Sequence, residues 1–337
     1  MSHSPRQVLC FGELLYRLAA PGREMLLQTP LLQVNLGGAE ANVAIALARF
    51  GHAVGMVSVL PNNALGNAAL GELKRHAVDC EHVLREPGRM GLYFLETGAL
   101  SRPSEVLYDR AGSAFASVDP TRFDWSHVLK DCSVLHLSGI TPALGASSAA
   151  ISLAAVRAAS ALGVTVAFDG NYRQSLWRAA GGDAASILRG LIEHADVLFA
   201  DQRDVALLLG VATQSFNEQT AAAAAFAAFP KLKRMASTIR STRSVDHQQL
   251  SAVLFTRQEK FRCGAYPLDS VVDRIGGGDA FAAGVIHGLL SDFTDADALR
   301  FGLASACLKH SIPGDFIRFG VPSVMQFLND EPIDVRR

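Results

Sequence analysis

A glycine-rich segment that ends in an aspartate is the strongest sign of chemistry in the sequence. It runs Asp273-Arg274-Ile275-Gly276-Gly277-Gly278-Asp279 and leads into a helix whose faces are nearly all apolar. Without Cβ atoms the glycines let backbone N–H groups converge on an anion, and the helix start adds the positive end of its dipole. A carboxylate beside such a nest suits a base that takes the proton of an attacking hydroxyl during phosphoryl transfer. The alternative is a tight turn in which Asp279 caps the helix.

A second glycine segment lies far upstream and reads Asn35-Leu36-Gly37-Gly38-Ala39-Glu40-Ala41-Asn42. The glycine pair again permits close approach of the backbone to a ligand. Asn42 offers a donor and an acceptor for sugar hydroxyls, and Glu40 offers an acceptor. Taken alone, this pattern favours an N-cap role for Asn42 in a helix from Asn42 to Phe50.

These segments need a scaffold, and the chain alternates short apolar runs with helical periodicity. The runs that predict strands are Val8–Phe11, Val134–Leu137, Val164–Phe168 and Val197–Phe199, and helices are expected at about Ala146–Leu162 and Val205–Leu209. Buried apolar strands joined by helices predict a mostly parallel sheet that is covered on both faces. Ligands of such sheets bind at the carboxyl ends of the strands, where Gly12, Asp169 and Asp201 are expected.

Two segments break this pattern. Residues 15–35 and 90–111 mix apolar and polar residues around turn signals and show no helical face, so we expect hairpins in a small separate sheet. We assign residues 1–14, 36–89 and 112–337 to an α/β core and these two segments to a lid. An ordinary surface excursion is the alternative.

Composition excludes several classes of protein. A formal net charge of −1 gives no sign of a nucleic-acid or anionic-membrane binder, and 49% hydrophobic with 19% charged residues fits a compact enzyme. Five scattered cysteines without a CxxC pair indicate a reducing compartment rather than disulfides or a zinc site. Residues 1–6 lack a secretory pattern, and no apolar run is long enough to cross a membrane, so we expect a cytoplasmic protein.

The two glycine motifs together resemble the signatures of the ribokinase-like (PfkB) carbohydrate kinases. The matching positions are Gly37-Gly38-x-x-x-Asn42 and Asp273-x-x-Gly276-x-Gly278-Asp279. The segment Asp169-Gly170-Asn171-Tyr172-Arg173-Gln174-Ser175-Leu176-Trp177 is similar to the D-x-N-x-R-x-x-L-W stretch of 2-keto-3-deoxygluconate kinases. Gly91-Leu92-Tyr93-Phe94 and Tyr108-Asp109-Arg110 stand where that subfamily places substrate contacts. The resemblance spans about the whole chain.

The resemblance implies a ribokinase-like, Rossmann-type three-layer core with a mostly parallel sheet and a small β-sheet lid, and we expect a homodimer through the lids. It implies transfer of the γ-phosphoryl group of ATP to the primary hydroxyl of 2-keto-3-deoxygluconate, which gives 2-keto-3-deoxy-6-phosphogluconate. Asp279 would be the catalytic base, and the amides of Gly276, Gly277 and Gly278 the anion hole. Members of the family need Mg²⁺, and many respond to a monovalent cation.

The substrate offers a check on this resemblance. A keto-deoxy sugar acid carries a carboxylate, which guanidinium binds bidentately, and Arg110 and Arg173 suit that role. For either arginine a surface salt bridge is the alternative. Tyr93 and Tyr108 can donate hydrogen bonds to sugar oxygens and pack against ring carbons. The expected substrate residues also include Gly37, Gly38, Asn42 and Asp279.

Three departures from the family pattern concern ATP and the metal. Arg274-Ile275 replaces the usual threonine pair. The N-x-x-E element appears as Asp201-Gln202-Arg203-Asp204, whose two carboxylates are expected to hold Mg²⁺ through water. The Gly-x-x-Gly nucleotide loop appears as the glycine-free segment 238–243. The residues expected to contact ATP are Asn171, Arg173, Asp201, Thr238, Arg240, Gly276 and Gly278.

Two other functions stay open. The first is a fructokinase or another neutral-sugar kinase of the same superfamily. The second is a non-catalytic sugar or nucleotide sensor, which the departures at Asp201, Arg274 and 238–243 would permit. A sensor, however, has no need of the base Asp279.

Overall fold

The apolar runs form a nine-stranded sheet in the computed structural model, which describes residues 7–245 and 247–329. Residues 1–6, whose sequence lacks a secretory pattern, lie outside the described residues. The strand order is β13-β12-β11-β10-β9-β8-β1-β4-β5, parallel from β11 to β5 and antiparallel between β11, β12 and β13. The strands are β1 Gln7–Phe11, β4 Val54–Pro61, β5 Val83–Glu86, β8 Cys132–Ser138, β9 Thr165–Asp169, β10 Val197–Phe199, β11 Arg234–Thr242, β12 His247–Thr256 and β13 Lys260–Asp269.

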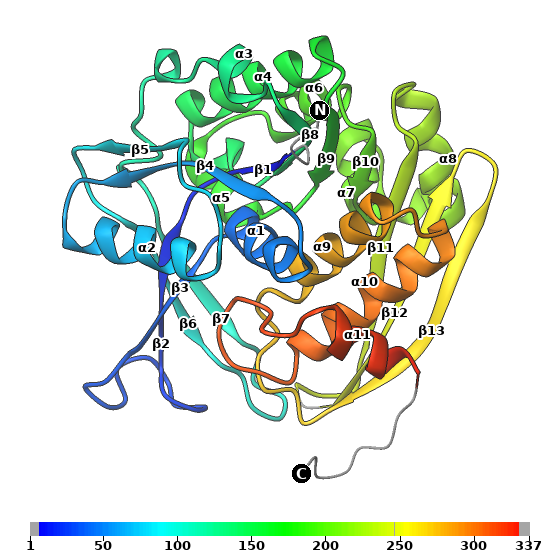
Figure 1. Ribbon diagram of the computed structural model, residues 1–337. Coiled ribbons are helices and arrows are strands. Elements are labelled where there is room, and N and C mark those ends of the chain that lie inside the picture. Colours follow the sequence, from blue (N-terminus) through cyan, green and yellow to red (C-terminus); the bar gives the residue numbers. More distant parts are fainter. Residues whose placement is uncertain (1–6, 246, 330–337) are drawn as a thin grey trace.

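Helices cover both faces of this sheet (Figure 1). Successive residues of a strand point to opposite faces, and Val8 and Cys10 of β1 accordingly belong to one buried cluster whereas Leu9 and Phe11 belong to another. The helices are α1 Ala39–Arg49, α2 Ala64–Arg75, α9 Gly277–Leu290, α10 Asp295–Lys309 and α11 Val321–Leu328 on the first face, and α3 Trp125–Val128, α4 Ala146–Ala161, α5 Gln174–Ala180, α6 Ala184–Ile192, α7 Gln202–Leu209 and α8 Glu218–Ala228 on the second. The predicted three-layer α/β fold with a mostly parallel sheet is confirmed.

A small four-stranded sheet accompanies the large one and projects downward in Figure 1. It has the order β3-β2-β6-β7, with β2 Leu15–Ala19, β3 Gln33–Gly37, β6 Gly91–Glu96 and β7 Glu105–Asp109. The pairs β2/β3 and β6/β7 are antiparallel, and β2/β6 is parallel. The small separate sheet expected from the sequence is therefore present, whereas the residue limits of a lid stay a prediction.

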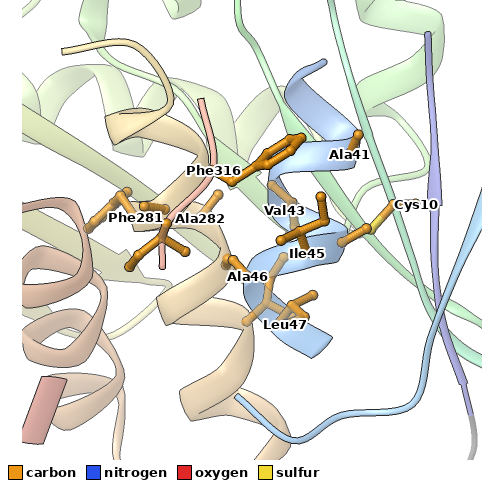
Figure 2. Packing of buried hydrophobic residues seen from close by; sticks show 14 of the residues in the cluster. Cys10, Ala41, Val43, Ile45, Ala46, Leu47, Phe281, Ala282 and Phe316 are labelled. Carbon is orange, nitrogen blue, oxygen red and sulfur yellow. The ribbon is translucent and has the colours of Figure 1, made fainter. Parts of the chain in front are cut away.

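Helices α1 and α9 pack against each other beside the large sheet, although more than 230 residues separate them. Figure 2 shows Val43, Ala46 and Leu47 of α1 facing Phe281 and Ala282 of α9. Because each helix begins at one of the glycine motifs, this apolar contact brings the two motifs together. Among the described helices none is both long and apolar enough to cross a membrane.

Candidate active site

The downstream glycines form the start of α9. Gly276 is its N-cap and adopts a left-handed φ of 78°, and a Cβ built there would lie 2.0 Å from the carbonyl oxygen of Asp315. This position therefore requires glycine. At Gly278 an added Cβ would meet nothing within 4 Å, so the space in front of the first turn is open. The Gly277 N–H donates to the Arg274 carbonyl at 3.3 Å. Within the described part of the chain no side chain caps this helix, which leaves the N–H groups of Gly278 and Asp279 available to an anion.

Asp279 lies in the first turn of α9 and does not cap the helix, so the capping alternative is wrong. Its Oδ2 accepts a hydrogen bond from Asn42 Nδ2 at 2.6 Å, which leaves Oδ1 for another partner. Burial raises the pKa of Asp279 to about 7, the Asn42 hydrogen bond lowers it, and the charge of Glu40 raises it further. A carboxyl group with a pKa near neutrality can both accept and release a proton at physiological pH.

Asn42 reaches Asp279 from inside α1 and not from its cap. The helix begins at Ala39 and Gly38 is the N-cap, so the N-cap role expected for Asn42 is wrong. Gly38 has a φ of 141°, and a Cβ there would lie 2.3 Å from the carbonyl oxygen of Glu13. A Cβ at Gly37 would lie 2.2 Å from a carboxylate oxygen of Asp315. The glycine pair therefore lets β3 and α1 approach the loop before β2 and the loop before α11.

Asp169 interacts electrostatically both with Asp279 and with Asp204. Burial raises the pKa of Asp169 to about 8, and the charges of Asp279 and Asp204 add to this shift. Burial likewise raises the pKa of Asp204 to about 6, with a further increase from Asp201. Arg173 acts in the opposite direction on Asp169, Asp204 and Asp279 alike. The sequence placed Asp169 at the rim of the sheet but gave it no chemical role.

Asp201 and Asp204 both belong to the capping box at the start of α7. Asp201 is the N-cap of α7, where its side chain accepts from the backbone N–H groups of Arg203 and Asp204 and pairs with the Arg203 guanidinium. The Asp204 side chain completes the capping box, because its Oδ2 accepts a hydrogen bond from the Asp201 N–H at 2.9 Å. The described residues contain no group of three or more His, Cys, Asp or Glu that could hold a metal ion. Binding of Mg²⁺ through Asp201 and Asp204 stays a prediction.

Segment 238–243 is a strand and not a loop over most of its length, contrary to the expectation. Thr238 and Arg240 lie in β11 and pair with Ala252 and Leu250 of β12, so their backbone groups belong to the sheet ladder. The Arg240 guanidinium contacts the Gln248 side-chain oxygen and lies 2.8 Å from Nε2 of His310. Burial and the charge of Arg274 lower the pKa of Arg240 to about 10. Contacts of these two side chains with ATP stay a prediction.

The two arginines expected to bind a carboxylate have different surroundings. Arg110 is buried, and its Nε donates to Glu13 Oε2 at 2.6 Å, while Ser113 donates to the other oxygen of Glu13. Arg173 is exposed at the start of α5, and its NH1 donates to the Tyr172 carbonyl at 3.3 Å. Asn171 precedes it with a left-handed φ of 37° and donates its N–H to Asp169. Arg110 therefore already has a carboxylate partner, and Arg173 faces the carboxylates around Asp279.

Tyr93 leads to a buried charge cluster that the sequence did not reveal. Its hydroxyl donates to Asp315 Oδ2 at 2.7 Å, and its ring lies 6.3 Å from that of Tyr108, its partner across the strands. Burial and the charge of Asp315 raise the pKa of Tyr93. Arg17 NH1 lies 2.8 Å from Asp273 Oδ2 and 3.2 Å from Asp315 Oδ1. Tyr93 is thus a hydrogen-bond donor here, but its partner is a carboxylate of the protein.

A hollow of about 450 Å³ lies beside this cluster, lined among others by Tyr16, Leu36, Glu72 and Asp315. Its lining does not include Asp279. Asp315 belongs both to this lining and to the Arg17 cluster, so the hollow adjoins the cluster. We therefore place the candidate reaction site at the open side of Gly278 and Asp279 rather than in this hollow.

Comparisons with known proteins agree with this geometry. The model of the pfkB family of carbohydrate kinases matches residues 5–315. The chain is 31% identical to a 2-dehydro-3-deoxygalactonokinase of Haloferax volcanii, covering 92% of both chains, and 31% identical to a 2-dehydro-3-deoxygluconokinase of Bacillus subtilis, covering 90% of both. A crystal structure of 2-dehydro-3-deoxygluconokinase from Thermotoga maritima superposes with a TM-score of 0.90 at 36% identity over 96% of this chain and 99% of that one.

Proposed function

The chain belongs to the pfkB family of carbohydrate kinases, and on that premise we propose that it phosphorylates 2-keto-3-deoxygluconate with ATP. The observation that carries the proposal is Asp279, which stands at an open glycine turn with a pKa near 7 and a fixed orientation. Kinase relatives of nearly equal length act on sugar acids by name, which supports an acid rather than a neutral sugar.

Asp279 starts the reaction as a base. Its carboxylate takes the proton of the primary hydroxyl, and the alkoxide oxygen forms a bond to the γ-phosphorus of ATP. The bond from that phosphorus to the bridging oxygen breaks, and ADP leaves. Asn42 holds Oδ2 so that Oδ1 meets the hydroxyl. The N–H groups at the start of α9 stabilise the charge that develops on the phosphoryl oxygens.

The carboxylates around the base fit a magnesium ion. Mg²⁺ prefers oxygen ligands, keeps several waters and binds through one or two carboxylates together with substrate phosphates. Burial raises the pKa values of Asp169 and Asp204, neighbouring carboxylates add to the shift, and a divalent cation nearby would favour their ionised forms. When bound, Mg²⁺ would neutralise charge on the ATP phosphates. Asp204 suits this role better than Asp201, whose carboxylate is engaged by Arg203 and the helix start.

Arg173 is the side chain we assign to the substrate carboxylate. It is exposed, lies at the carboxyl end of β9 and acts electrostatically on Asp279. Arg110 keeps its pair with Glu13, and both side chains are buried. Taking Arg110 from Glu13 would leave a buried carboxylate unpaired, which is strongly unfavourable. In this proposal Arg110 shapes the site and contributes to substrate binding through its position rather than as the main ion pair.

A second copy of the chain is the partner we propose for the small sheet. Leu31, Val34 and Leu107 are 65%, 61% and 59% exposed on or beside its outer strands. Exposed apolar residues on one small sheet favour an interaction surface. Light scattering of Leu107→Glu should give a monomer where the wild type gives a dimer.

The five free cysteines support a reducing, cytoplasmic setting.

A coupled assay with ATP and Mg²⁺ tests the substrate. We expect turnover with 2-keto-3-deoxygluconate to exceed turnover with fructose and ribose, and its galactonate epimer should be included because it differs at one hydroxyl. Preference for a neutral sugar would retain the base but overturn the carboxylate role of Arg173. Absence of turnover with every sugar would overturn the proposal as a whole.

A further inference from the structure

Lys309 is a fully buried cation that the proposed reaction does not use. It is the last residue of α10 and has 0% exposure. Its Nζ lies 3.4 Å from the carbonyl oxygen of Asp273 and 3.2 Å from that of Ile312. A buried ammonium is retained only where oxygen atoms and negative charges replace its hydration. Its surroundings therefore indicate what the charge does.

Two carboxylates and a guanidinium complete those surroundings. Arg17 lies between Asp273 and Asp315, and Tyr93 donates to Asp315. Burial lowers the pKa of Lys309, whereas the charges of Asp273 and Asp315 raise it. Two positive and two negative groups thus form a cluster whose formal charges cancel. Without Lys309 the cluster would carry a net negative charge in the interior.

Lys309 joins the segment around Asp273 to the segment around Ile312, and these two segments also enclose the anion-binding turn. The Gly314 N–H donates to Asp273 Oδ2 at 3.0 Å, and the Val272 N–H donates to the His310 carbonyl at 2.9 Å. The backbone of Asp315 lies so close to Gly276 that no Cβ fits between them. Any shift of either segment therefore moves Gly276 and, with it, the first turn of α9.

We propose that the ammonium group of Lys309 is a built-in monovalent cation that positions the Gly276–Gly278 turn, so that the enzyme needs no diffusible monovalent cation at this place. The proposal rests on the proposed kinase function for its kinetic part. Lys309 is a positioning residue, because it touches the carbonyl oxygens of Asp273 and Ile312 and not the reacting atoms. It replaces the response to a monovalent cation that the family resemblance implied.

The chemistry of the ligands supplies the reason for a rescue experiment. Carbonyl oxygens and carboxylates attract ammonium and potassium as they attract an alkylammonium, because all three carry one positive charge. Lys309→Ala would leave space and oxygen atoms for a small cation, whereas Lys309→Met would fill the space without a charge. The two variants therefore separate loss of charge from loss of packing. Lys130→Ala removes an exposed lysine and is the control.

Turnover is measured in buffers whose only cations besides Mg²⁺ are tetramethylammonium, ammonium, methylammonium or potassium. We expect the wild type and Lys130→Ala to change less than twofold between them. Lys309→Ala should lose at least about tenfold in kcat with a smaller change in KM, and ammonium, methylammonium or potassium should restore part of it. Lys309→Met should show the loss without the rescue.

Thermal unfolding gives a readout that needs no substrate. The midpoint of Lys309→Ala should rise in ammonium relative to tetramethylammonium, and that of the wild type should not. Activation of the wild type by potassium would overturn the proposal, and this measurement holds even if neither Lys309 variant folds. Normal kcat in Lys309→Ala, or a loss that no cation changes in either assay, would also overturn it. If the wild type turned over no sugar, the proposed function would fail, while the unfolding comparison would still decide the role of Lys309.

Discussion

Asp279→Asn should abolish turnover and at the same time stabilise the protein, most of all at alkaline pH. Asparagine keeps the shape of the side chain and can still face Asn42, but it cannot accept the substrate proton. The folded protein raises the pKa of Asp279 from 3.8 to about 7, so its charged form is less favourable there than in the unfolded chain. The substitution removes that charge.

The sign and size of the effect follow from proton linkage. Between the unfolded pKa of 3.8 and the folded pKa of about 7 the folded state binds the additional proton, so the stability contributed by Asp279 falls as pH rises through this window. Above it the ionised carboxylate costs at most about 4 kcal/mol. The gain in free energy of unfolding that Asp279→Asn brings over the wild type should therefore be larger at about pH 8.5 than at about pH 5.5, by at most about 2 kcal/mol. Because Asp279 is partly exposed, solvent screening reduces this difference, and we expect about 1 kcal/mol.

Two measurements on one preparation test this prediction. Thermal or urea unfolding at the two pH values gives the pH-dependent difference, which corresponds to about 1 to 2 degrees in Tm for a chain of 337 residues. The coupled assay gives kcat, and calorimetric titration shows whether the sugar acid still binds. Asp131→Asn, an exposed aspartate, is the matched control and should show no pH-dependent gain. Retained turnover, equal loss of substrate binding, or a stability change independent of pH would refute the assignment of Asp279 as a buried base.

Three further predictions concern its neighbours. Asn42→Ala removes a hydrogen bond that lowers the pKa of Asp279, so the acidic limb of the kcat–pH profile should move to higher pH. Arg173→Ala should raise KM for the sugar acid at least about tenfold and leave KM for fructose nearly unchanged. The control variant Arg178→Ala should change neither KM. Arg110→Met should destabilise the protein by about 3–5 kcal/mol in urea unfolding, because the buried carboxylate of Glu13 loses its ion-pair partner. Adding Glu13→Gln should restore much of this stability.

The sequence predicted the glycine-rich start of α9 because its signal is local. Gly276 and Gly278 stand next to Asp279, and a glycine turn before a helix has a physical meaning that needs no tertiary contact. The partnership of Asp279 with Asn42 depends instead on the packing of α1 against α9, and only the family resemblance placed both residues in one site. Without that packing, Asn42 looked like a helix cap, which was wrong.

Segment 238–243 shows how a resemblance can override a propensity. Its position in the family pattern suggested a nucleotide loop, yet Thr238, Ile239 and Thr242 are β-branched and favour a strand. The structure places Arg234–Thr242 in β11 with a full antiparallel ladder to β12. The local composition was the better guide here, because a loop that cradles phosphates needs glycines that the segment lacks.

The buried ion pairs could not be predicted, because each partner looks ordinary in its own segment. The alternation of β2 puts Arg17 on the same face as Leu15 and Ala19, which hints at burial, but nothing in the segment names Asp273 or Asp315 as its partners. Those carboxylates lie some 250 residues or more downstream. Pairings across such a distance follow from topology and not from local pattern.

The two groups of buried charges differ in a way that separates structure from function. The cluster of Arg17, Lys309, Asp273 and Asp315 contains its own counterions, so it is complete without a ligand. The group of Asp169, Asp204 and Asp279 has pKa values between about 6 and 8 because burial disfavours its charged forms and neighbouring carboxylates add to the shift, whereas Arg173 opposes it. An uncompensated group of this kind gains free energy when a cation binds, and by linkage that gain must grow as pH rises through these pKa values. We therefore propose that the first group holds the Gly276–Gly278 turn in place, and that the second is where Mg²⁺, ATP and the hydroxyl proton exchange charge with the protein.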